Sequence, residues 1–287
     1  MEKRLRNIDL HMHTTVSDGT DTPEMLIGAV KAAGIEVFSA TDHDAVKTGL
    51  IIRSLLEPGD PVFITGAEFS CKDEEGKYHI LGYGFDPSGA PMAGLVRKGH
   101  ALRMKKVAAR IGFIKSEFGF EFRKEDIDSL FALDNPGKPH IANLMVKYGY
   151  ATDKDTAMRE YLNRMRFRSE YVRPEEAISA VTAAGGIPVL AHPFYGSGDE
   201  LILGDEMEDR LRRLMEMGLR GVEAFYSGFS AKLRENMLAL ARKYRLYVTA
   251  GSDYHGSNKL VTLGDTGLRD AGEMPEGLIR FLKDAVK

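Results

Sequence analysis

Short apolar runs alternate with longer amphipathic segments along most of this chain. Seven of these runs are four to eight residues long, and most are rich in β-branched or aromatic residues, which is typical of buried strands. They cover residues 8–11, 37–42, 62–69, 78–85, 187–192, 221–226 and 246–253.

The segments between the runs carry helix signals. A Thr-Pro-Glu sequence at 22–24 combines an N-cap, a proline suited to the first helical position and an acidic first turn, so we expect a helix over 23–34. Residues 173–186 repeat this pattern, and residues 205–218 and 230–244 have apolar positions three and four apart. Strands that alternate with helices predict parallel βα units, and seven of them predict an α/β fold with a closed or nearly closed barrel.

One connection does not follow this pattern. Only the turn-rich residues 70–77 separate the third and fourth runs, too few for a crossover helix. We therefore expect an antiparallel hairpin at this point. The hairpin would bring His79 next to Glu68.

The alternation also stops between residues 97 and 170. Helical patterns over 99–122, 124–133 and 152–167 predict a helical insertion there. We expect it to cap the active-site face of a barrel that is built from residues 1–96 and 171–287.

Charge is distributed unevenly between these two parts. The insertion carries 16 Lys and Arg against 10 Asp and Glu, a net charge of +6, whereas the rest of the chain has −9 and the whole has −3. A basic segment on an acidic body suggests an anionic substrate, and the plainer alternative is a solvated, lysine-rich helix surface. The overall charge predicts no stable binding of duplex nucleic acid.

The single cysteine, Cys71, excludes an internal disulfide and suits a reducing compartment. No apolar signal core and no segment long enough to span a bilayer is present. We expect a soluble, cytoplasmic protein without a membrane partner.

Histidines and carboxylates follow the ends of the predicted strands. His11 and His13 alternate with Met12 after the first strand, so both imidazoles leave the backbone on the same side. Further candidates at strand ends or on the hairpin are Asp18, Asp42, His43, Asp44, Glu68, His79, His192, Asp253 and His255. In a barrel of βα units the carboxyl ends of the strands form the face on which active sites are built.

Such a cluster would be costly without cations, so we predict that it binds divalent metal. The candidates are too many for one ion. Nitrogen and oxygen donors without thiolate suit zinc, manganese or iron, and the donor type does not choose among these metals.

Six motifs in order carry a resemblance to a known family: "DLHMHTTVSDG", "ATDHD", "GAEFS", "YHILGYGF", "AHP" and "GSDYHG". Together they resemble the PHP (polymerase and histidinol phosphatase) family of metallophosphoesterases. Within the insertion, "GKPHIANLM" and "EYLNRMRFRSEYVRPEEAI" resemble the branch with bacterial nucleoside 3′,5′-bisphosphate phosphatases and 5′-3′ exoribonucleases. The family implies a distorted seven-stranded, TIM-like (β/α)7 barrel that holds three divalent metal ions.

The resemblance also implies a set of ligands for each ion. The first ion would take His11, His13, Glu68 and Asp253. The second would take Glu68, His79 and His192, so that Glu68 bridges two ions. The third would take Asp18, His43 and His255.

We expect this centre to hydrolyse phosphate esters of nucleotides by attack of a metal-activated hydroxide on phosphorus. Glu68, His255 and Asp42 are the catalytic candidates. Asp42 would either protonate the leaving oxygen or orient a histidine ligand, and we favour the second role. The cations expected to hold phosphate are Lys138, His140, Arg164 and Arg166, with Arg103 as a weaker candidate.

The expected substrate is a nucleoside 3′,5′-bisphosphate, the 5′ end of a short RNA, or both, and the sequence leaves this open. A histidinol-phosphate phosphatase would share the metal site. An amidohydrolase that cleaves C–N bonds would use the same barrel, although it usually adds a lysine at a strand end, which this chain lacks at the predicted positions. A non-enzymatic binding module would tolerate the loss of several ligands, and this chain retains the full set.

Overall fold

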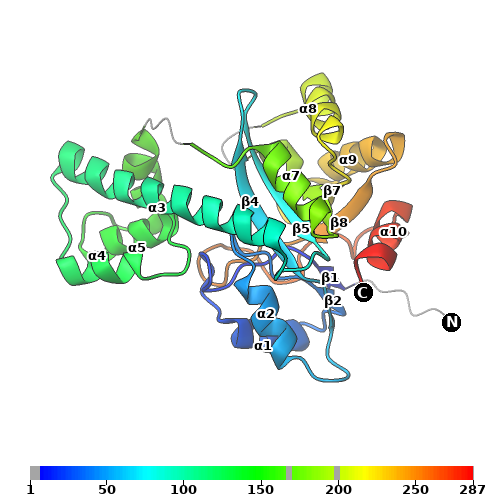
Figure 1. Cartoon of the computed structure of the whole chain (residues 1–287), viewed down its shortest axis with the longest axis horizontal. Coiled ribbons are helices and arrows are strands. Elements are labelled where there is room, and N and C mark those ends of the chain that lie inside the picture. Colours follow the sequence, from blue (N-terminus) through cyan, green and yellow to red (C-terminus); the bar gives the residue numbers. More distant parts are fainter. Residues whose placement is uncertain (1–6, 166–169, 197–200, 287) are drawn as a thin grey trace.

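The computed structural model describes residues 7–165, 170–196 and 201–286, and its strands form two sheets (Figure 1). The first sheet consists of three parallel strands in the order β1-β2-β3, and the second has the order β4-β5-β6-β7-β8. The strands are β1 Ile8–Asp9, β2 Val37–Phe38, β3 Val62–Phe63, β4 Gly66–Lys72, β5 Lys77–Tyr83, β6 Ile187–Leu190, β7 Gly221–Tyr226 and β8 Tyr247–Gly251.

Helices connect most of the strands, in keeping with an α/β fold. The α-helices are α1 Pro23–Ala32, α2 Lys47–Leu55, α3 Ala90–Phe118, α4 Lys124–Phe131, α5 Lys138–Lys147, α6 Lys154–Thr156, α7 Pro174–Ala183, α8 Gly204–Glu216, α9 Ala231–Lys243 and α10 Glu276–Ala285. A π-helical turn at Ala157–Tyr161 and 3₁₀ turns at Leu162–Arg164 and Pro193–Tyr195 complete the described elements. Helices α2, α5 and α10 were not predicted from the pattern.

The predicted hairpin is confirmed. Strands β4 and β5 are antiparallel, with Glu68 opposite Leu81 and Ser70 opposite His79. Strand β5 also pairs antiparallel with β6, so it runs against its neighbours on both sides. His79 therefore lies near the beginning of β5, and Glu68 lies near the beginning of β4, whereas His11, His192 and Asp253 follow the ends of β1, β6 and β8.

The third predicted strand, 62–69, divides into two in the structure. Strand β3 pairs with β2 in the first sheet, and β4 begins the second sheet after only two residues. Gly66 starts β4 at a close approach, because a Cβ atom there would overlap the side chain of Ser39. The single-strand prediction was wrong because this change of sheet depends on partners that are distant in sequence.

Backbone hydrogen bonds connect the two sheets at both edges. The amide of Leu10 donates to the carbonyl of Ala250 at 2.8 Å, beside β1 and β8. The amide of Asp44 donates to the carbonyl of Glu68 at 2.8 Å, beside β4. Ile8 and Leu10, in and beside β1, share an apolar cluster with residues of the second sheet.

The helices α3, α4 and α5 extend to one side of the sheets (Figure 1). Helix α3 is longer than the predicted 99–122 at its start, and the left-handed Gly119 (φ 70°) ends it. This group of helices has its own apolar cluster, separate from the core beneath the sheets. The cluster consists of Val107, Ile114, Leu130, Ile141, Ala142, Met145, Ala157 and Leu162.

No helix among the described residues combines the length and apolar composition needed to cross a membrane.

Candidate metal centre

His11 and His13, which follow β1, aim their imidazole Nε2 atoms at the same two carboxylates. Their Nε2 atoms lie 3.3 and 3.2 Å from Oε2 of Glu68, and 3.5 and 3.4 Å from Oδ1 of Asp253. Both histidines are fully buried, and neither Nε2 atom makes a hydrogen bond. Two buried, unpaired nitrogens that converge on carboxylate oxygens fit the binding of a cation.

Glu68 of β4 lies at the middle of the cluster and presents its two oxygens to different sides. Its Oε1 atom is 2.9 Å from Nδ1 of His79 and 3.2 Å from Nε2 of His192. Its Oε2 atom faces His11, His13 and also His43, whose Nδ1 lies 3.1 Å away. This arrangement suits a carboxylate that bridges two ions.

Asp18 gathers the remaining histidines on the other side of His13. Its Oδ1 atom lies 3.4 Å from Nε2 of His255 and 3.7 Å from Nδ1 of His13, and its Oδ2 atom lies 3.9 Å from Nε2 of His43. The rings of His13 and His255 stack with centroids 4.0 Å apart.

Among the described residues, three groups bring their donor atoms within 4.8 Å of one another. They are His13-Asp18-His43-His255, His11-His13-Asp253 and His43-Glu68-His79. These groups contain eight of the nine residues that the sequence suggested as metal ligands, and the ninth, His192, joins them through its contact with Glu68.

The charges in the cluster are those of a site that needs cations. Burial favours neutral carboxyl groups, yet the surrounding histidines hold the pKa of Glu68 well below its ordinary value. Burial also opposes protonation of His11 and His13, but nearby carboxylates raise the pKa of His11 well above its ordinary value and that of His13 to about 9. A divalent ion at this place would meet the same carboxylates and would displace any proton held by the two imidazoles.

The backbone is strained at the same place. His192 and Asp253 have φ angles of 27° and 59°, in the left-handed region that side-chain-bearing residues rarely adopt. Asp44, directly after His43, has a φ of 50°. Such conformations persist where surrounding contacts over-determine them, as they do in binding sites.

Three residues that support the cluster were missed by the sequence analysis. Glu223 of β7 is fully buried, and its carboxylate contacts Nδ1 of His11 at 3.0 Å and accepts from the amide of His192 at 2.8 Å. Tyr226 donates to Oδ2 of Asp253 at 3.0 Å, and Lys259 donates to the same oxygen. For Glu223 the sequence offered one signal, because an acidic residue inside the apolar run "GVEAFY" needs a buried partner.

Asp42 does not contact any histidine of the cluster directly. It accepts hydrogen bonds from the amide and hydroxyl of Thr14 and from the hydroxyls of Ser17 and Thr48. The Ser17 hydroxyl in turn lies 3.4 Å from Nδ1 of His13. This geometry favours an orienting role, because Asp42 is occupied by four donors of the chain itself.

The predicted phosphate-binding residues are only partly brought together. Lys138 lines a cavity beside the cluster and donates to Asn163 at 2.7 Å. His140 accepts from the amide of Gly137 at the start of α5. Arg103 also lines the cavity, but its guanidinium donates two hydrogen bonds to Asp44.

Arg164 lies apart from these residues. Its side chain is 61% exposed and lies 3.7 Å from Glu160. It is on the outward surface of the turn because the helix at 152–167 ends early, in π and 3₁₀ turns. Arg166 lies outside the described residues.

Two cavities meet at the cluster, and both are lined by Asp18, His43 and His79. One, of about 190 Å³, is strongly cationic. The other, of about 360 Å³, is lined by most of the cluster itself, including Glu68, His192, Asp253 and His255, and Tyr195, Tyr226 and Met158 add apolar surface to its wall. The cluster therefore opens into a cavity with an aromatic wall and borders a basic one.

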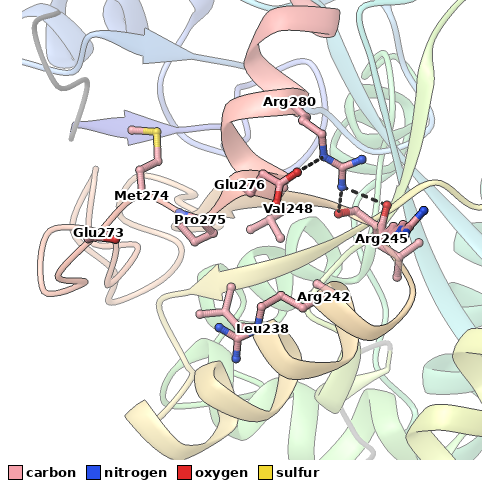
Figure 2. Close-up of a pocket in the computed structure, with 12 residues that line it drawn as sticks. Leu238, Arg242, Arg245, Val248, Glu273, Met274, Pro275, Glu276 and Arg280 are labelled. Carbon is pink, nitrogen blue, oxygen red and sulfur yellow. Dashed lines mark hydrogen bonds and ion pairs between the residues drawn. The ribbon is translucent and has the colours of Figure 1, made fainter.

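A further cavity of about 870 Å³ lies between α9, α10 and the beginning of β8 (Figure 2). Arg280 crosses one of its walls and donates to the carbonyls of Arg245 and Leu246. This cavity lies at the amino end of β8, whereas Asp253 and His255 follow the carboxyl end of that strand. No histidine is among the described residues that line it, so it is not part of the metal centre.

Three curated proteins are similar to most of the chain. A phosphoribosyl 1,2-cyclic phosphate 1,2-diphosphodiesterase of Eggerthella lenta is 30% identical over 266 residues, which cover 86% of this chain and 94% of that protein. A 5′-3′ exoribonuclease of Haemophilus influenzae is 27% identical, with coverage of 90% and 93%. A 3′,5′-nucleoside bisphosphate phosphatase of Chromobacterium violaceum is 28% identical, with coverage of 93% and 91%. No protein-family model matches the chain.

Solved structures agree with this fold. A protein of Bifidobacterium adolescentis described as a metal-dependent phosphoesterase superposes with a TM-score of 0.84 at 26% identity, covering 98% of this chain and 96% of its own. A structure from Chromobacterium violaceum named as an amidohydrolase gives a TM-score of 0.80 at 24% identity, covering 89% and 90%. The second likeness concerns the fold alone.

Proposed function

Since the chain belongs to the PHP family of metal-dependent phosphoesterases, in the branch of nucleoside bisphosphate phosphatases and 5′-3′ exoribonucleases, we propose that it hydrolyses phosphate esters of nucleotides. The observation that carries this proposal is the convergence of six histidines and three carboxylates on one buried point. The donor set supports divalent metal, because buried imidazole nitrogens of His11, His13 and His43 lack a hydrogen-bond partner.

The proposed ligand sets follow the proximity of the side chains. The first ion would be held by His11, His13, Glu68 and Asp253, the second by Glu68, His79 and His192, and the third by Asp18, His43 and His255. The distances support Glu68 as the bridge, because each of its oxygens faces a different group of histidines. Zinc, manganese and iron all remain suitable for these nitrogen and oxygen donors.

When bound, divalent ions would lower the pKa of a water molecule toward neutrality and neutralise phosphoryl oxygens. The protein's own contribution is orientation. Glu223 fixes the ring of His11, and Asp42 fixes the loop that follows His13, so that ligand nitrogens point at the centre. Glu68 and His255 would act at the reacting phosphoryl group as ligands rather than as proton donors.

We also propose that the two sheets form one distorted barrel with the helices of residues 97–170 as its cap. The backbone hydrogen bonds Leu10–Ala250 and Asp44–Glu68 at the sheet edges support the barrel. The separate apolar cluster of the α3–α5 region supports an insertion that packs as a unit.

The two cavities at the cluster support a nucleotide substrate with groups on both sides of the scissile ester. A nucleoside 3′,5′-bisphosphate fits such a site, and so does the 5′-phosphorylated end of a short RNA. We place the nucleoside on the aromatic side, where Tyr195, Tyr226 and Met158 offer apolar surface.

Two readouts with the manganese-loaded protein test the proposal: release of inorganic phosphate from the phosphomonoesters, and release of 5′-mononucleotides from the RNA. The substrates are adenosine 3′,5′-bisphosphate, short 5′-phosphorylated RNA, histidinol phosphate and p-nitrophenyl phosphate. We expect turnover of the first two that is abolished in His11→Ala and retained in His100→Ala, a histidine on α3 outside the cluster.

Turnover of histidinol phosphate alone would overturn the nucleotide assignment. Failure to cleave any phosphoester, with metal present by elemental analysis, would overturn the phosphoesterase assignment and favour C–N hydrolysis or a binding role.

A further inference from the structure

The large cavity at the amino end of β8 is built by side chains that the proposed metal centre does not use (Figure 2). Its volume of about 870 Å³ is in the range of pockets that hold small organic ligands. Apolar residues of its described lining include Leu246, Val248 and Met274. The charged residues of that lining are Arg242, Arg245, Arg280, Glu273 and Glu276. The cavity thus combines apolar surface with an excess of cations.

Arg245 occupies a backbone position that three other helices of this chain give to glycine. Gly34, Gly185 and Gly218 follow the ends of α1, α7 and α8 with φ angles of 65°, 77° and 103°. Arg245 follows the end of α9 with a φ of 53°. A side chain in this left-handed conformation costs free energy that glycine avoids. An arginine is therefore unfavourable for ending the helix, which points to another role for its guanidinium.

Arg280 of α10 reaches across the cavity wall to the connection between α9 and β8 (Figure 2). Its Nη2 atom donates to the carbonyls of Arg245 and Leu246, both at 3.0 Å. Its buried Nε atom has no hydrogen-bond partner, and a carboxylate oxygen of Glu276 lies 3.9 Å away. The Glu276 side chain is itself 89% exposed. The guanidinium is thus held in place by the backbone, while its charge is weakly compensated.

The other two arginines have no acidic partner in the part of the chain that the structure describes. There, neither Arg242 nor Arg245 has a carboxylate oxygen within 4.0 Å. Glu276 and Gly277, the first residues of α10, line the same cavity, and the N-cap residue Pro275 makes no side-chain hydrogen bond to their amides. The positive end of the helix dipole adds to the charge of the arginines. An anion is the ligand that these groups would stabilise.

We propose that this cavity binds a nucleoside monophosphate at a site separate from the metal centre. Its phosphate would lie against the guanidinium groups of Arg242, Arg245 and Arg280. The base would lie on the apolar wall, and Glu273 would accept a hydrogen bond from a ribose hydroxyl. The site is at the opposite end of β8 from Asp253, so the inference goes beyond the proposed function and does not depend on it.

The mixed lining favours a nucleotide over simpler anions. Inorganic phosphate would use the arginines and leave the apolar surface without a partner. A fatty acid would cover the apolar surface, but it has no hydroxyl groups to donate to the two glutamates. A nucleoside monophosphate brings an anionic group, hydroxyl donors and a planar base in one molecule, and a guanidinium can donate two parallel hydrogen bonds to its phosphate.

Calorimetric titration of the full chain with adenosine 5′-monophosphate tests the site. The titration is carried out on the manganese-loaded wild type and on His11→Ala, which removes a ligand of the proposed metal centre. We expect His11→Ala to keep saturable binding of one nucleotide. Adenosine and inorganic phosphate are each expected to bind at least about tenfold more weakly, because each lacks part of the recognised structure.

Two further substitutions in the His11→Ala protein separate binding from folding. Arg245→Gly removes a guanidinium and supplies the residue that the left-handed backbone favours, so the melting temperature of the free protein is expected not to fall. Arg242→Met keeps an unbranched side chain without the charge. We expect each to weaken nucleotide binding about tenfold to a hundredfold. The matched control Lys232→Met, at an exposed lysine of α9 outside the cavity, is expected to keep the affinity.

No nucleotide binding by His11→Ala would overturn the site, and so would affinity within about twofold of the parent in both arginine variants. Equal affinity for adenosine 5′-monophosphate and inorganic phosphate would overturn the nucleotide assignment. A lower melting temperature of free Arg245→Gly would mark the arginine as structural and refute its role in binding. These outcomes leave phosphoester hydrolysis by the wild type untouched, so the two proposals fail separately.

Discussion

Glu223 gives the sharpest test of how the chain prepares its metal centre. The replacement Glu223→Gln keeps the shape of the side chain and removes its charge. One carboxylate oxygen contacts Nδ1 of His11 at 3.0 Å, and the other accepts from the amide of His192 at 2.8 Å. With Nδ1 of His11 as the donor, an amide cannot accept at both positions, so one of the two contacts is lost.

The magnitude follows from the kind of bond that is removed. A hydrogen bond to a charged group contributes about 1.5–3 kcal/mol, and loss of a carboxylate that orients a metal-bound histidine weakens metal affinity roughly 10- to 100-fold. We expect Glu223→Gln to weaken manganese binding by that factor, with catalysis falling in proportion at limiting metal.

The assay is competition between the protein and a chelator of known affinity. Glu235→Gln, on the exposed face of α9, is the matched control and is expected to bind metal like the wild type. Circular dichroism verifies that both variants are folded. A folded Glu223→Gln protein with metal affinity within about twofold of the wild type would refute the orienting role.

Three further predictions concern other contacts. Arg103→Met breaks a buried ion pair with Asp44 and is expected to lower the free energy of unfolding by about 3–5 kcal/mol in urea denaturation. Replacing both Arg103 and Asp44 should lower the free energy of unfolding by less than Arg103→Met alone. An equal or larger loss in the double variant would contradict this reasoning. Gly251→Ala would place a Cβ atom against the side chains of His11 and Glu223 and is expected to abolish metal binding. Gly28→Ala, inside α1, meets no atom within 4 Å and is expected to stabilise the folded protein by about 0.5–1 kcal/mol in thermal denaturation. Because desolvation lowers the pKa of Lys106 to about 7 in the folded protein, the free energy of unfolding should rise as pH increases from 7 to 10, by up to about 1.4 kcal/mol per pH unit. Urea denaturation that finds no such rise, or finds it unchanged in Lys106→Met, would contradict the prediction.

The strand pattern predicted the cluster well because its determinants are local. Residues that follow a strand end lie at a fixed place relative to the sheet, so His11, His43 and His192 could be assigned to one face from their positions alone. The short, turn-rich connection at 70–77 likewise dictated an antiparallel hairpin. These features require no knowledge of distant contacts.

Other features depended on distant partners and were missed. The division of 62–69 into β3 and β4 is set by pairing with β2 and β5, which a strand pattern does not reveal. Lys106 and Arg110 look in sequence like any solvated helix face, and only the structure shows that both are half-buried, with Lys106 over the ring of Tyr171. The cation pattern of the insertion therefore suggested an anion site, which stays a prediction, and did not indicate that Lys106 and Arg110 line a cavity beside the cluster.

The separate apolar cluster of the helical insertion has an evolutionary consequence. Residues such as Ile114 and Met145 pack within the insertion and not against the core of the sheets, so substitutions there are uncoupled from the metal centre. The insertion meets the rest of the chain through Leu102, which lies in the apolar core of the sheets, and through polar contacts that include Arg103 with Asp44 and Lys154 with Asn258. Descendants of one ancestral chain could thus acquire new substrates by remodelling these helices, provided that those contacts are inherited with them.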